Sequence, residues 1–128
     1  MMKKILILAS LVLMVSLASA SSMTVSVSDT TGGSGATVEV PINLEGATDV
    51  GSMDIVLSYD SAVLQAIGVD SGELGKNAYI ESNTAGNGVV VIALADASGI
   101  SGNGPVAVVS FEVIGETGSS SPLILGDI

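Results

Sequence analysis

The residues of this 128-residue chain with the clearest chemical potential are its acids, several of which stand in turn-like segments. Carboxylates in turns can hold calcium, which takes about six to eight oxygen ligands. The sequence has no Asp-x-Asp-x-Asp-Gly run to supply them. We therefore expect the turn aspartates to accept hydrogen bonds from their own backbone rather than to bind a metal. They are Asp29, Asp49, Asp60, Asp70 and Asp96.

Histidine and cysteine are both missing from the sequence. Their absence excludes Ser-His and Cys-His catalytic pairs and every Cys/His zinc site. The composition does not exclude a hydrolase that uses two catalytic carboxylates. However, the spacing of the acids singles out no pair, and there is no Trp to hold a sugar. We predict a protein that is not an enzyme and needs no cofactor. If calcium takes part, we expect the partner to bind it.

The charge of the chain is strongly negative. Thirteen acids against three bases give a net charge of −10 at pH 7. Such a surface repels nucleic acid and anionic lipid head groups, and it favours solubility, calcium or a basic partner. The composition therefore predicts no nucleic-acid partner.

The first twenty residues have the pattern of an export signal. Two lysines precede an apolar run over residues 5–17, and Ala-Ser-Ala at 18–20 fits a cleavage site. The run is shorter than the ~20 apolar residues of a membrane span, so we expect cleavage rather than a retained anchor. We predict a signal peptide at 1–20 and one domain at 21–128, secreted and either free or attached to the cell surface. We expect contact with the membrane only through the export signal. Cleavage of this signal removes Lys3 and Lys4 and changes the net charge from −10 to −12.

The strands that must position the polar residues are predicted from the alternation of apolar and polar residues along the sequence. Met53, Ile55 and Leu57 alternate with smaller or polar neighbours, which is the period of a strand with one face on a core. The outward face of this strand carries a single charge, on Asp54, so it is a candidate docking surface.

Eight such segments follow one another with Gly- and Ser-rich turns between them, and no stretch has helical periodicity. The predicted strands span residues 23–28, 37–44, 50–59, 63–69, 77–83, 89–94, 105–114 and 122–128. The predicted turns and loops include residues 29–35, 45–49, 70–76 and 96–104. The pattern predicts an all-β fold, a two-sheet antiparallel β-sandwich with jelly-roll topology and about eight strands.

Two strands carry a further signal. Pro41 cannot donate to a ladder, which predicts a bulge there or a place near a sheet edge. The run over residues 89–94 is almost wholly apolar, which indicates a central strand with both faces covered or with one face left for a partner.

The segment from Gly51 to Leu64 reads Gly-Ser-Met-Asp-Ile-Val-Leu-Ser-Tyr-Asp-Ser-Ala-Val-Leu. It closely resembles the G-x-x-D-F-x-L-x-Y-D-P-x-V-L segment of cohesin domains, with Ser61 where the family often has Pro. The resemblance runs from about Met23 to Val113 and includes Val-Glu-Val-Pro-Ile-Asn-Leu and Val-Val-Val-Ile-Ala-Leu-Ala-Asp. It implies a nine-stranded jelly roll whose last strand joins the first. The sequence stops before such a strand, so we expect either a fragment or a natural short version with an unpaired edge at residues 23–28.

The resemblance also implies a partner and a binding face. Cohesins bind dockerin modules across the sheet formed by their third, fifth, sixth and eighth strands. The matching positions here are Ser52, Asp54, Val56, Tyr79, Glu81, Asn83 and Asp96. Asp54 falls on a family position that hydrogen-bonds to dockerin Ser or Thr groups, and Asp96 falls where some members carry a contacting Glu. The alternative is an ordinary exposed residue at each position, and a core residue at Tyr79.

Three functions are weighed on these grounds. The first is a secreted, non-catalytic cohesin-like module that binds a dockerin-like partner and scaffolds an extracellular or cell-surface assembly, such as one that degrades polysaccharides. The second is a carbohydrate-binding module, which is disfavoured because sugar platforms use aromatic faces and the chain has two Tyr and one Phe. The third is a structural cell-surface domain.

Overall fold

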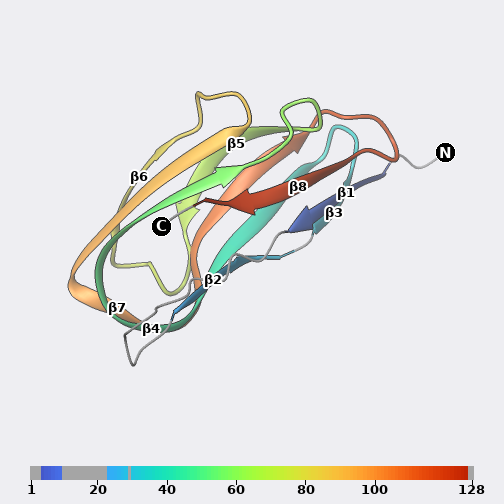
Figure 1. The fold of residues 1–128 in the computed structure, drawn as a ribbon. Coiled ribbons are helices and arrows are strands. Elements are labelled where there is room, and N and C mark those ends of the chain that lie inside the picture. Colours follow the sequence, from blue (N-terminus) through green and yellow to red (C-terminus); the bar gives the residue numbers. More distant parts are fainter. Residues whose placement is uncertain (1–3, 10–22, 29, 127–128) are drawn as a thin grey trace.

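The computed structural model describes residues 4–9, 23–28 and 30–126, and within them it contains strands and no helix (Figure 1). The strands are β1 (Lys4–Ala9), β2 (Thr24–Val27), β3 (Thr30–Gly33), β4 (Thr37–Ser58), β5 (Leu64–Ser71), β6 (Tyr79–Asn83), β7 (Val89–Val113) and β8 (Ser120–Leu125). In the part of the chain so described, nothing helical is long and apolar enough to cross a membrane. The all-β prediction is confirmed.

The strands form two layers because β4 and β7 are long enough to run through both (Figure 1). One sheet has the order β2-β4-β7-β5 and uses residues 37–44 of β4 and 104–113 of β7. The other has the order β8-β4-β7-β6 and uses residues 52–58 and 89–95. All these pairs are antiparallel, so the predicted two-sheet antiparallel sandwich is confirmed.

The predicted loops at 45–49 and 96–104 were wrong, because both segments belong to continuous strands that bend from one sheet to the other. The β4–β7 register shifts repeatedly between Leu44 and Ser52. Asp49 and Gly99 have positive φ angles of 50° and 81°, a conformation that sharp bends require and that Gly adopts without strain. The Asp49 backbone N–H donates to Ser101 Oγ at 2.8 Å and so ties the two bends together. Glycine and serine here mark the bend rather than a loop.

The chain before β4 also differs from expectation. Residues 30–33, expected within a turn, form β3, which pairs antiparallel with β1. Strand β1 pairs parallel with β8 and lies inside the segment 1–20, whose role as an export signal stays a prediction. Asp29 lies outside the described residues.

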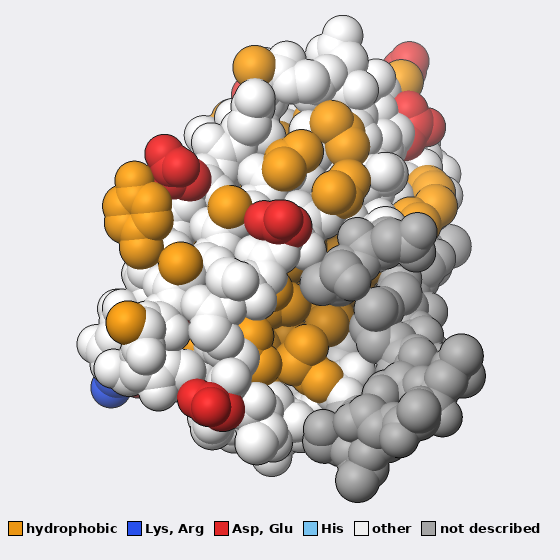
Figure 2. Space-filling view, turned by 60° about the vertical axis from the view of Figure 1, so that its left-hand side comes forward, with side chains coloured by type: hydrophobic (Ala, Val, Ile, Leu, Met, Phe, Trp, Pro, Cys, Tyr) orange, Lys and Arg blue, Asp and Glu red, His pale blue; other side chains and the backbone are white. Residues whose placement is uncertain are grey.

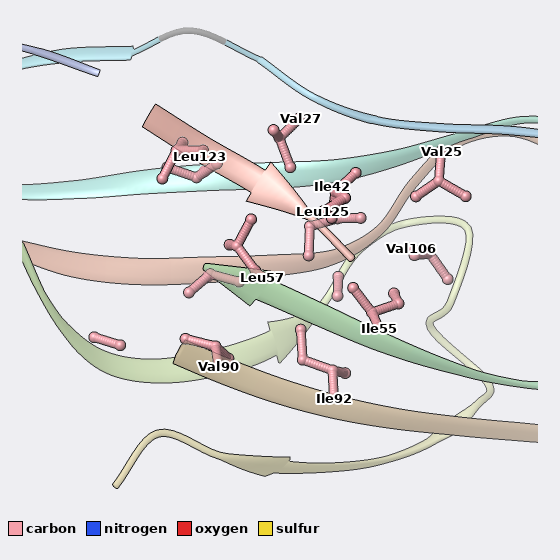
Figure 3. Packing of buried hydrophobic residues seen from close by; sticks show 14 of the residues in the cluster. Val25, Val27, Ile42, Ile55, Leu57, Val90, Ile92, Val106, Leu123 and Leu125 are labelled. Carbon is pink, nitrogen blue, oxygen red and sulfur yellow. The ribbon is translucent and has the colours of Figure 1, made fainter. Parts of the chain in front are cut away.

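The core fills the space between the two sheets with aliphatic side chains (Figure 3). Ile55, Leu57, Val90 and Ile92 are fully buried, as the alternation in the sequence requires. Phe111, the largest fully buried side chain, meets the ring of Tyr59 edge to face, with centroids 5.0 Å apart. The aromatic pair adds a directional contact to a core that is otherwise made of interchangeable branched side chains.

Pro41 lies beside the end of a ladder. It is in register with Val108 on β7, and the shift that follows Ile42 skips Val106 of β7, so β4 itself has no bulge at Pro41. The described pairing of β2 with β4 begins at Ile42, so the missing N–H of Pro41 falls where that ladder ends, as the near-edge alternative requires.

Candidate functional site

Six of the seven predicted site residues lie together on the outer face of the β8-β4-β7-β6 sheet. The register aligns them in three neighbouring rungs that cross β4, β7 and β6. The rungs are Ser52–Ala95–Tyr79, Asp54–Ala93–Glu81 and Val56–Val91–Asn83. We call the surface formed by these nine residues the candidate face.

The candidate face exists because the pairing here has no irregularity. From Ser52 to Ser58 the β4–β7 register runs without a shift, so every second residue points the same way. Met53, Ile55 and Leu57 then face the core. A slip of one residue would bury Asp54 and expose Ile55, which the hydrophobic core forbids.

The side chains of the candidate face are open to solvent. Ser52, Asp54, Glu81 and Asn83 are exposed, and Val56 is half-buried. Tyr79 is 66% exposed, so the alternative that placed it in the core is wrong. An exposed tyrosine beside two carboxylates is a typical anchor of a protein interface.

The centre of the candidate face was not among the predicted site residues. It is formed by Val91, Ala93 and Ala95 on β7, and Val91 is 41% exposed. The apolar run at 89–94 signalled it, because the structure confirms the alternative in which one face is left open. Ile124 on β8, 45% exposed, extends the apolar surface next to Ser58. No pattern in the sequence pointed to Ile124, because its place depends on how β8 pairs with β4.

The face is polar without being densely charged. Brought forward from the β6 side, the molecule shows separate acidic side chains set among apolar ones (Figure 2). Glu81, Ser82, Asn83, Val91 and Ala93 line a shallow depression of about 260 Å³ on it. This combination can accept hydrogen bonds and apolar side chains from one partner.

Asp96, the seventh predicted residue, lies apart from the rungs. It is half-buried where β7 begins to bend, and its Oδ1 accepts the backbone N–H of Ser98 at 2.8 Å. Asp60 does the same for the N–H of Ala62 at 2.9 Å. The predicted hydrogen bonding within turns is thus confirmed for Asp60 and Asp96. Among the described residues, no three His, Cys, Asp or Glu side chains gather in a way that could hold a metal ion.

The aromatic residues bear on the carbohydrate alternative. Tyr59 and Phe111 pack together against the core, which leaves Tyr79 as the exposed aromatic of the chain. A sugar platform generally needs more than one aromatic face, so the arrangement does not favour carbohydrate binding.

Comparison with known proteins gives a family match over most of the chain. Residues 23–126 match the model of the cohesin domain. No curated protein sequence matches.

Solved structures share the fold. A non-cellulosomal cohesin from the hyperthermophilic archaeon Archaeoglobus fulgidus is similar with a TM-score of 0.61 and 21% identity, covering 97% of this chain and 89% of that one. The sixth cohesin of Acetivibrio cellulolyticus scaffoldin B, solved with a mutant Cel5 dockerin, gives 0.65 and 19%, covering 98% and 82%. A type I cohesin–dockerin complex from Clostridium thermocellum gives 0.63 and 17%, covering 98% and 79%.

Proposed function

This chain belongs to the cohesin domain family, and we propose that it is a non-catalytic module that binds a dockerin-like partner across the candidate face. The observation that carries the proposal is the alignment of Ser52, Asp54 and Val56 on β4 with Tyr79, Glu81 and Asn83 on β6 in neighbouring rungs. Cohesins solved together with dockerins support the choice of partner.

The chemistry of the candidate face fits such a partner. Asp54 accepts hydrogen bonds from hydroxyl or basic groups, and the short side chains of Ala93 and Ala95 beside it leave room for a helix to approach. Asp96 forms a more distant contact at the end of the same sheet. The net negative charge of the chain attracts a partner whose binding surface is basic. No cofactor takes part, and any calcium belongs to the partner.

The cellular setting is part of the proposal. Residues 1–20 direct export, after which the domain acts outside the cell, free or attached to its surface. There it joins its partner to an extracellular assembly, of the kind that degrades polysaccharides. The support for export is the run of two lysines, an apolar stretch and Ala-Ser-Ala at the start of the sequence.

Affinity capture tests the proposal. The 128-residue chain is immobilised and exposed to the secreted proteins of the producing organism, once with calcium and once with a chelator, and bound proteins are identified by mass spectrometry. We expect a dockerin-bearing protein to be retained only with calcium, because a module that folds around the ion loses its structure without it. Circular dichroism of the immobilised batch verifies that it is folded.

Two results would contradict the proposal. A folded chain that retains no dockerin-bearing protein would favour the structural role. Retention on insoluble cellulose or chitin, without any protein partner, would favour the carbohydrate role.

A further inference from the structure

An asparagine followed by glycine can be attacked by its own backbone, and the sequence contains this pair twice. One pair, Asn87–Gly88, lies in the turn between β6 and β7, and the other, Asn103–Gly104, lies inside β7 where the strand bends. Glycine favours the attack because it has no side chain to shield its nitrogen and its backbone is flexible. The remaining asparagines all precede a residue with a side chain; they are Asn43, Asn77 and Asn83.

The turn requires glycine at position 88. Gly88 has a φ angle of 82°, and a Cβ atom placed on it would lie 2.9 Å from the backbone oxygen of Tyr59. The Gly88 carbonyl also accepts the Tyr59 N–H at 2.9 Å. A side chain at this position would therefore strain the backbone and collide with the neighbouring strand end. The packing of the turn thus keeps a glycine directly after Asn87.

The two groups that would react at this turn are not held by the described part of the chain. Asn87 is exposed, and its side-chain amide makes no hydrogen bond with the described residues. The N–H of Gly88 donates to none of them either, although its carbonyl is bonded. The amide of Asn87 can therefore turn toward the Gly88 nitrogen without breaking a contact that the structure shows.

The second pair is held in two ways. Asn103 Oδ1 accepts the Gly46 N–H at 2.7 Å, which keeps the side chain directed toward β4. The next residue, Gly104, is in register with Leu44 in the β4–β7 ladder, which fixes its backbone. Attack at Asn103 therefore requires the side-chain hydrogen bond and this part of the ladder to open first.

We propose that Asn87 is a self-modification site, at which the chain converts its own asparagine into aspartate and isoaspartate. The Gly88 nitrogen loses its proton and attacks Cγ of Asn87, so an N–Cγ bond forms and the Cγ–Nδ2 bond breaks. Ammonia leaves, taking up one proton. Water then opens the cyclic succinimide at either of its carbonyls, which gives aspartate or isoaspartate with no change of oxidation state. The product places a new carboxylate in the turn between β6 and β7.

Peptide mapping tests the proposal on the 128-residue chain. The folded chain is kept at mildly alkaline pH, samples are digested with pepsin, and mass spectrometry follows the loss of ammonia at each asparagine. We expect Asn87 to react at least about ten-fold faster than Asn103, because the bonds that hold Asn103 raise the barrier there. An unmodified Asn87, or an equal or faster reaction at Asn103, would overturn the inference.

The same measurement in urea separates the fold from the sequence. Both pairs are Asn–Gly, so the two sites should react at similar rates once the β4–β7 ladder is unfolded. A ten-fold preference for Asn87 that persists in urea would show that the fold does not protect Asn103 and would refute that part of the inference.

A matched pair of variants checks the site itself. Asn87→Gln and Asn77→Gln each replace one exposed asparagine, but Asn77 precedes Ala78. Glutamine would have to close a larger ring, so Asn87→Gln should abolish isoaspartate formation in the folded chain, while Asn77→Gln should leave it at the wild-type level. An isoaspartyl methyltransferase with a labelled methyl donor measures it, and circular dichroism verifies folding. Isoaspartate that persists in Asn87→Gln would refute the site. No partner takes part in these readouts, so they do not depend on the proposed function.

Discussion

The two outer faces of the sandwich come from the same two central strands, yet their centres expose different chemistry. On the candidate face β7 contributes Val91, Ala93 and Ala95, none of which carries a charge or a polar side chain. The charges stand on the strands to either side, as Asp54 on β4 and Glu81 on β6. The centre is therefore low and apolar, between two lines of acceptors.

The opposite face, on the β2-β4-β7-β5 sheet, is arranged the other way. There β7 contributes Val108, Ser110 and Glu112, so a charge stands on the central strand itself. On β4 the neighbours are Glu39, opposite Ser110, and Pro41, opposite Val108. Both faces cover the same core, so burial alone does not distinguish them. The two faces differ in their centres, which are apolar on the candidate face and charged on the opposite one, and under the proposed function the apolar centre is the feature that suits docking.

The largest expected effect comes from a change that damages the support of the candidate face. Leu57→Ala removes a fully buried side chain beneath it and should lower the free energy of unfolding by about 2–5 kcal/mol, because a cavity remains. Val56→Ala, on the outward side of the same strand, should cost less than about 1 kcal/mol. Urea denaturation measures both. If both variants lost the same free energy of unfolding, the assignment of Leu57 to the buried side of β4 and of Val56 to its outward side would be wrong.

A smaller effect separates the two faces directly. Asp54→Ala on the candidate face should weaken binding of the captured dockerin by at least about 1 kcal/mol, because it removes a central acceptor. Glu39→Ala removes the same charge from the opposite face and should leave the affinity unchanged. Isothermal titration calorimetry compares them. An affinity that Asp54→Ala leaves unaltered would remove Asp54 from the interface.

The smallest expected effect concerns Asp96, at the margin of the candidate face. Asp96→Ala should lower the free energy of unfolding by about 1 kcal/mol, because the N–H of Ser98 loses its acceptor. Asp96→Asn keeps an oxygen at that place and should unfold at nearly the wild-type urea concentration. Both variants should weaken partner binding less than Asp54→Ala does. If Asp96→Asn weakened binding as strongly while leaving stability intact, the charge of Asp96 would be a principal contact.

The local sequence was sufficient to predict which side of a strand such as residues 50–59 faces the core. Alternation around Met53, Ile55 and Leu57 predicted which side is buried, because a side chain in a strand must point to one face or the other. Alternation in residues 77–83 predicted a strand but did not decide its outward side, since a core position stayed open for Tyr79. The positions matched by the cohesin resemblance, Asp96 apart, fall in neighbouring rungs and so form one continuous surface, and its role in binding stays a prediction.

The arrangement of the strands could not be predicted in the same way. The bends of β4 and β7 lie in Gly- and Ser-rich segments, and such segments have the same composition whether they form a loop or carry a strand from one sheet to the next. Long-range contacts decide that they bend together: the pairs Ala47–Gly102 and Val50–Ile100, and the hydrogen bond from the Asp49 N–H to the Ser101 hydroxyl, 52 residues away.

The sequence by itself thus determined the all-β class, the absence of His and Cys chemistry, the negative charge and the facing of Asp54, because each depends on composition or on neighbours within one strand. The tertiary structure alone decided that Ala93 lies between Asp54 and Glu81 and that Ile124 extends the apolar surface. These features depend on registers between segments distant in the chain, which are fixed only when both sheets close on one core.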